Sequence, residues 1–163
     1  MDIVSHGLYG WALFGNKDKK QFWLAFGFGV LPDFVAFGLP FASSIAGMVF
    51  HGTPVMFSKT NIPNYVHTIY NVSHSLITWS VVFTALRIIY KKPIKASYAR
   101  LLHILMDIPT HSLAFFATPF LWPLSNYRFD GIPWSDKIIF LPNIAILIII
   151  YSIYFRKKYK KTH

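Results

Sequence analysis

The 163-residue sequence contains no cysteine and no glutamate, and its six acidic residues are all aspartate. Without cysteine the chain can form neither a disulfide scaffold nor a thiolate zinc site. Charged residues make up only 13% of the sequence, against about 25% in soluble domains, so a soluble fold would lack charge to cover its surface. Aromatic residues make up 18%, which excludes a disordered chain. These scarcities favour a membrane protein.

Apolar residues gather in four stretches that approach the roughly 20 residues needed to span a bilayer. The first stretch contains Pro32 and Asp33, and the third contains Asp107 and Pro109, so both are interrupted. The second and fourth are the clearest. The expected spans are residues 22–40, 69–90, 99–121 and 137–155.

The predicted fold is therefore all-α: a polytopic membrane helical bundle of about four spanning helices plus an N-terminal half-helix over residues 3–15. Residues 41–68 form the longest expected loop, with a short interfacial helix near 45–50. No removable signal peptide is expected, because the N-terminal stretch lacks a basic start. A single integral membrane domain is predicted over 1–163, with the site region at 2–136, an anchor helix at 137–155 and a basic tail at 156–163.

The net charge of +10 is unevenly distributed between the two sides that four spans create. Only Lys59, Arg128 and Lys137 fall on or next to one side, whereas the other 13 of the 16 cations fall on the opposite side. By the positive-inside rule the side with more cations is cytoplasmic. The sequence thus predicts a multi-pass inner-membrane protein with a cytoplasmic C-terminus. The lipid bilayer, and no nucleic acid, is the expected partner of this charge, and the oligomeric state is left open.

Several ionisable residues lie within stretches that should be apolar. An aspartate near the middle of a spanning helix costs at least about 2.5–3.5 kcal/mol, so such residues usually pair, bind an ion or line a cavity. The six ionisable residues of these stretches are His6, Asp33, His74, His103, Asp107 and His111. At 1.5 Å rise per residue, most of the six lie about 11–17 Å from the cytoplasmic end of their segments, near the bilayer midplane.

The third stretch carries the strongest local pattern, because His103, Asp107 and His111 are spaced four residues apart. Each step of four rotates only about 40° around a helix, so the three side chains form one stripe. Two imidazoles and a carboxylate are typical ligands of divalent transition metals. Pro109 lies inside the stripe and should kink the helix there. The pattern indicates metal or proton chemistry.

Other interpretations of these residues stay open. A single histidine in a helix is more often a hydrogen-bonded core residue than a ligand, and no site role is expected for His51 or His163. His67 lies just before the second span and could reach the site. Taken alone, intramembrane histidine and aspartate also suit a proton or ion transporter or relay. A membrane scaffold with a structural metal is the third possibility.

Four ordered segments carry a resemblance to a known family. They are DIVSHG at 2–7, GVLPD at 29–33, YNVSHSL at 70–76 and LHILMDIPTH at 102–111. Together they resemble the LexA-binding, inner-membrane-associated metal-dependent hydrolase family, and residues 118–125 and 129–134 look like one branch of it. The match runs from about residue 2 to residue 136.

The resemblance implies a helical membrane protein with a metal centre and hydrolase activity. The family is also distantly similar to zinc-dependent phospholipase C, which implies zinc, with manganese or iron as alternatives. Many members have a second aspartate where this chain has Val35, and a His-Arg pair where it has Ile69 and Tyr70, so one or two metals are implied. Carried over position by position, the implied metal ligands are His6, Asp33, His74, His103, Asp107 and His111.

The leading interpretation is a membrane-bound, metal-dependent hydrolase of a phosphoester or another small-molecule or lipid-linked substrate. Asp33 and Asp107 are the candidate catalytic residues, each as ligand or as base. Arg128 is a candidate anion anchor. Four residues are expected to orient the imidazoles through hydrogen bonds: Asn71, Ser73, Ser75 and Thr110.

Overall fold

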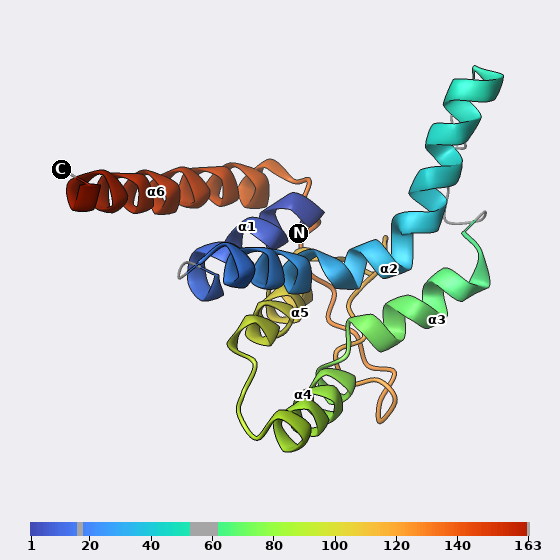
Figure 1. The fold of residues 1–163 in the computed structure, drawn as a ribbon. Helices are drawn as coiled ribbons and strands as arrows, with labels where there is room; N and C mark the ends of the chain where they lie inside the picture. Colours follow the sequence, from blue (N-terminus) through green and yellow to red (C-terminus); the bar gives the residue numbers. More distant parts are fainter. Residues whose placement is uncertain (16–17, 53–61, 163) are drawn as a thin grey trace.

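The computed structural model describes residues 1–15, 18–52 and 62–162, and every regular element in these ranges is a helix (Figure 1). The all-α prediction is therefore confirmed for this part of the chain. The helices are α1 (Ile3–Phe14), α2 (Lys19–His51), α3 (Asn64–Ser73), α4 (Leu76–Tyr90), η2 (Lys95–Ser97), α5 (Tyr98–Thr110) and α6 (Lys137–Thr162). The element η2 is a single 3₁₀ turn.

The helices α1 and α2 form an antiparallel pair. An aspartate caps the start of each, because Asp2 and Asp18 accept a hydrogen bond from the amide three residues on, at 2.9 and 2.8 Å. The two backbones approach closely where α2 has Gly29, since a Cβ atom there would lie 2.5 Å from the carbonyl oxygen of His6. The short N-terminal helix and its pairing with the first apolar stretch are thus observed.

The helix α2 is longer than the first expected span. It contains Pro32 and Pro40 and changes direction along its length (Figure 1), as expected where proline removes a backbone hydrogen bond. It ends at His51, followed by Gly52 with φ of 69°, a left-handed conformation that favours glycine. The prediction of a loop from residue 41 is therefore wrong for 41–51, and the short helix expected at 45–50 is the end of α2. Residues 53–61 lie outside the described ranges.

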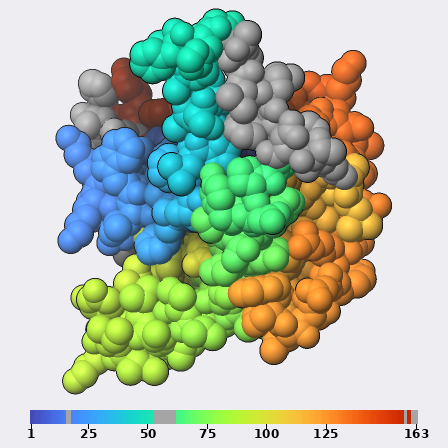
Figure 2. All heavy atoms as spheres, turned by 90° about the vertical axis from the view of Figure 1, so that its right-hand side faces the viewer, coloured from blue at the N-terminus to red at the C-terminus, as the bar shows by residue number. Residues whose placement is uncertain are grey.

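The second expected span is two helices, α3 and α4, bent by 58° at a short break. His74 ends α3, and Ser75 starts α4 by accepting hydrogen bonds from the amides of Ile77 and Thr78 at 3.1 and 3.2 Å. In Figure 2, α3 (green) lies between the blue first half of α2 and the orange segment that follows α5, and α4 (yellow-green) lies below the blue part. The break places His74 inside the fold, where its side chain is fully buried.

The third expected span is helical only over α5, and residues 111–136 contain no helix. His111 has extended backbone angles, φ −122° and ψ 143°. The helix end is covered by the segment 131–134, whose amides bond to the last carbonyls of the helix: Gly131 to His111 at 2.9 Å, Ile132 to Pro109 at 3.0 Å and Trp134 to Thr110 at 2.9 Å. These bonds replace the next helical turn, which explains why the helix stops at Thr110.

The last helix, α6, packs beside α1. The Asn143 amide donates to Ser5 Oγ at 2.8 Å, and the Tyr151 hydroxyl donates to the carbonyl of Leu8 at 2.8 Å. Two helices of the described chain, α2 and α6, are long and apolar enough to cross a membrane, and α3 with α4 makes a third if the bent pair is one span. Membrane association is therefore supported, whereas the four-span arrangement stays a prediction.

Candidate metal centre

Four predicted ligands from three helices meet in one buried cluster: Asp33 of α2, His74 at the end of α3, and His103 and Asp107 of α5. Each residue offers one oxygen or nitrogen atom, and these atoms lie within 4.8 Å of one another. Asp107 and His74 are fully buried, and Asp33 is 8% exposed. Two carboxylates and two imidazoles form a ligand set suited to zinc or another divalent transition metal.

The hydrogen bonds of the two imidazoles fix which nitrogen faces the cluster. His103 Nδ1 lies 2.6 Å from the carbonyl oxygen of Gly29, and His74 Nδ1 lies 3.2 Å from that of Tyr70. A carbonyl only accepts, so we assign the hydrogen of each neutral ring to Nδ1. Both Nε2 atoms are then bare acceptors that point inward. Backbone carbonyls that hold Nδ1–H in this way are the usual partners of metal-binding histidines.

The inward-facing atoms are all acceptors at close range. The Nε2 atoms of His74 and His103 lie 3.0 Å apart. His74 Nε2 is 3.2 Å from an oxygen of Asp33, and His103 Nε2 is 3.1 Å from Oδ2 of Asp107. That Oδ2 atom is buried and has no hydrogen-bond partner. Such a set repels itself unless a cation or added protons sit among the atoms, so the donor chemistry fits a bound divalent metal.

The two remaining predicted ligands lie against the other oxygen of Asp107. His6 Nε2 is 2.9 Å and His111 Nδ1 is 3.2 Å from Oδ1. The α-amino group of Met1 also contacts this oxygen. The ring of His6 stacks on that of His103 with centroids 3.6 Å apart. All six residues therefore converge, although only the first four share one set of facing atoms.

The residues expected to orient the imidazoles divide into two groups. Ser73 Oγ lies 2.9 Å from His74 Nδ1, and Thr110 Oγ accepts from the Met1 amine at 3.1 Å, so both border the cluster. Ser75 instead caps α4 and also contacts the carbonyl of Trp122. Asn71 accepts from the guanidinium of Arg128 at 2.9 Å, and a second nitrogen of that group donates to a backbone carbonyl.

Two further histidines, His67 and His51, lie apart from the cluster. His67 stacks on Phe116 with centroids 5.1 Å apart and is exposed. His51 is exposed at the end of α2. His163 lies outside the described residues.

Three supporting residues were not foreseen from the sequence. The carbonyl of Gly29 holds His103, and the ring of Tyr70 stacks on His74 with centroids 3.8 Å apart. Arg100 donates to the carbonyl of Ser73 at 3.0 and 3.2 Å and to that of Val72 at 3.1 Å, which are the last two residues of α3. Only the spacing of Arg100 three residues before His103, on the same side of α5, could have indicated its place.

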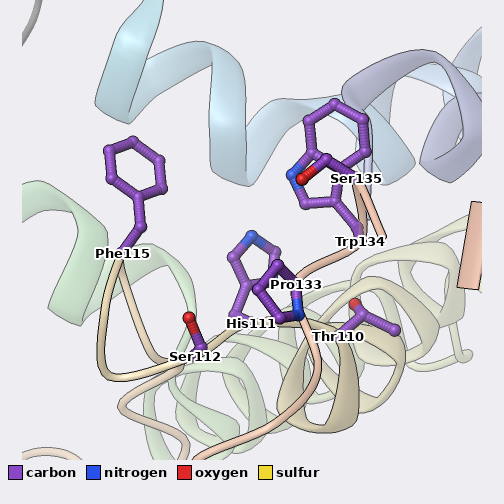
Figure 3. A pocket seen from close by; sticks show the side chains of 7 residues that line it. All are labelled: Thr110, His111, Ser112, Phe115, Pro133, Trp134 and Ser135. Atoms are coloured by element: carbon purple, nitrogen blue, oxygen red, sulfur yellow. The ribbon is translucent and has the colours of Figure 1, made fainter. Parts of the chain in front are cut away.

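A pocket of about 260 Å³ adjoins the cluster at the end of α5 (Figure 3). His111 forms part of its lining and also contacts Asp107, so it connects the pocket with the buried atoms. The lining residues are Thr110, His111, Ser112, Phe115, Pro133, Trp134 and Ser135. The arrangement thus combines a buried set of metal-type ligands with an open space next to it.

Comparisons with protein families, curated proteins and solved structures found no match to this chain.

Proposed function

We propose that the protein is a membrane-bound, metal-dependent hydrolase that acts on a phosphoester or another lipid-linked ester. One observation carries the proposal: four buried acceptor atoms of Asp33, His74, His103 and Asp107 face one another, and His111 joins them to a pocket. A catalytic metal site needs an open position for water or substrate, and the adjoining pocket provides space for it, which favours hydrolysis over a structural metal. A transport path would need polar groups in file across the membrane rather than in one cluster.

The two aspartates suit different roles. A divalent ion, zinc in first place, supplies Lewis acidity that activates water and polarises the ester. Asp107 is fully buried and contacts His6 and His111 through Oδ1, so we assign it to holding the metal. The Asp33 side chain is 12% exposed, against 0% for Asp107. We therefore assign Asp33 as the carboxylate that accepts a proton from the attacking water.

We also propose four membrane crossings with the C-terminus in the cytoplasm. The crossings are α2, α3 with α4, α5 with the segment after it, and α6. Non-helical backbone at membrane depth is tolerated where protein surrounds it. The contacts Ser5–Asn143 and Leu8–Tyr151 mean that α1 and α6 run parallel, so both lead towards basic segments. This direction supports the assignment of the thirteen-cation side to the cytoplasm.

Membership of the LexA-binding, inner-membrane-associated metal-dependent hydrolase family is likewise our proposal. It is supported by the motif residues and by their convergence, since the family positions His6, Asp33, His74, His103 and Asp107 all lie in one buried cluster. An inner-membrane location would follow.

The test is metal content and hydrolysis by the protein purified in detergent. The natural chain should hold stoichiometric divalent metal and cleave phosphodiester or phosphomonoester lipids, whereas Asp107→Asn should lose both. Asp136→Asn is the matched control, because Asp136 lies outside the cluster and accepts from the Ile138 amide at 3.0 Å, which asparagine also does. Absence of metal in the gently purified natural chain would refute the proposal. Full metal retention by Asp107→Asn would refute the ligand assignment.

A further inference from the structure

The pocket at the end of α5 is lined by aromatic side chains and by His111, which contacts the buried cluster. Figure 3 shows Phe115 and Trp134 on opposite sides, with His111 between them. The imidazole of His111 lies 3.2 Å from Asp107. A group bound in this space would therefore lie next to the buried cluster.

The polar part of the pocket suggests the chemistry of its ligand. Ser112 is 7% exposed, and its hydroxyl oxygen is buried without a hydrogen-bond partner in the described part of the chain. An unpaired buried hydroxyl is destabilising, and a hydrogen bond with a ligand hydroxyl would satisfy it. The lining contains no lysine, arginine or aspartate, so a phosphate head would find no opposite charge there, and an ammonium head would have only the aromatic faces of the lining to hold it. Aromatic walls and hydroxyls suit an uncharged polyol.

The direction of α5 places the pocket away from the basic segments. At the start of α5, Ala99 lies against Gly10 near the end of α1, and Tyr98 contacts Phe14 with centroids 6.1 Å apart. This end of the bundle adjoins the start of α2, which carries Lys19 and Lys20. His111 lies at the other end of α5, so the pocket opens towards the opposite side.

We infer that this pocket is the entrance to the metal centre from the non-cytoplasmic side, and that it receives the uncharged polyol head group of a phospholipid-type ester. The inference rests on the proposed function and adds the side of entry and the substrate class. Trp134 provides a face for the polyol, and the Ser112 hydroxyl bonds to one of its oxygens. The ester then lies beside His111, within reach of the cluster.

The absence of cysteine makes the side of entry directly measurable. Single cysteines are introduced as Ser112→Cys inside the pocket, Ser135→Cys at its exposed rim and Lys92→Cys in the exposed loop after α4. A membrane-impermeant maleimide should label both pocket variants in right-side-out vesicles and label Lys92→Cys only in inverted vesicles. Pocket variants that label from the same side as Lys92→Cys would overturn the inference. Ser135→Cys keeps the test valid if Ser112→Cys does not fold.

The ligand class is tested by protection from the same label. Glycerophosphoglycerol or glycerophosphoinositol should slow labelling of Ser135→Cys, which keeps the Ser112 hydroxyl, and the comparison separates a glycerol from a cyclic polyol. Phosphocholine, which has a cationic head and no polyol, should not protect, and protection by it would overturn the polyol assignment. The Trp134→Ala change in this background should abolish protection, whereas Trp134→Phe should retain it. Labelling needs no turnover, so a lack of hydrolysis would refute the proposed function without affecting these results.

Discussion

Replacing Gly29 by alanine should disturb the metal centre from outside its ligand set. The new Cβ would lie 2.5 Å from the carbonyl oxygen of His6 and 3.1 Å from Cα of Gly7. Both neighbours are backbone atoms, so no side-chain rotation can relieve the overlap. The helix α1 must move away from α2, and it carries His6 with it.

The size of the effect follows from these distances. Ordinary contacts begin at 3.4 Å, so α1 must shift by about 0.9 Å. Overpacking of this kind typically costs about 1–3 kcal/mol. The shift is also larger than the roughly 0.2 Å tolerance of metal–ligand distances, and it moves His6, whose Nε2 atom lies 2.9 Å from Oδ1 of Asp107. Loss of such a supporting bond typically weakens metal binding by about 10–100-fold.

The same helix provides the matched control. Gly27 lies two residues earlier, and a Cβ there would meet nothing within 4 Å. Gly27→Ala should therefore stabilise the helix by about 0.5–1 kcal/mol, so the free energies of unfolding of the two variants should differ by about 1.5–4 kcal/mol. The assay is thermal unfolding in detergent together with metal affinity by competition with a chelating dye. If Gly29→Ala matched Gly27→Ala in both measurements, the close approach of α1 and α2 at the metal centre would be wrong.

Three further predictions concern the surroundings of the cluster. Arg100→Gln should weaken metal binding by about tenfold, because the Ser73 carbonyl loses its donors and His74 follows directly in the chain; unchanged affinity would show that α3 is held otherwise. Gly131→Ala would place a Cβ 2.3 Å from the Pro109 carbonyl oxygen and should release the segment 131–134 from the end of α5. Proteolysis or amide exchange of this segment should then be faster than in the natural chain, and unchanged rates would contradict the prediction. A strong chelator should lower the unfolding temperature of the natural chain, whereas an equal decrease in a variant that binds no metal would point to a nonspecific effect.

The sequence contained the local part of the site but not its partners. His103 and Asp107 share one face of α5, as their four-residue spacing predicts. Nothing in spacing alone brings Asp33 and His74 to that face, because tertiary contacts place them there. Their inclusion depended on the ordered motifs and on a depth argument. The backbone carbonyl of Gly29, which holds His103, has no sequence signal at all.

The helix boundaries failed where polar groups interrupt apolar runs. Ser75 is a helix-capping residue within an apolar stretch, and it marks the break that turns one expected span into α3 and α4. Pro109 was expected to kink the third stretch, and α5 instead ends one residue after it. Its outcome depends on Gly131 and the segment after it, which supply donors to the helix end from more than 20 residues away. Arg100 was counted with the cytoplasmic cations, yet it donates to the end of α3.

The distribution of the six aspartates gives the strongest argument for a cation in this fold. Four of them accept hydrogen bonds from backbone amides, at helix starts or in a turn: Asp2, Asp18, Asp130 and Asp136. Asp33 and Asp107 are buried and accept from no backbone amide in the described residues. Within the same ranges, neither aspartate pairs with lysine or arginine, and the α-amino group of Met1 contacts only one of them. Arg100 and Arg128 bond to neutral oxygens instead. Two buried carboxylates next to two bare imidazole nitrogens are stable only if positive charge is added there, and a divalent metal supplies the amount that two carboxylates require.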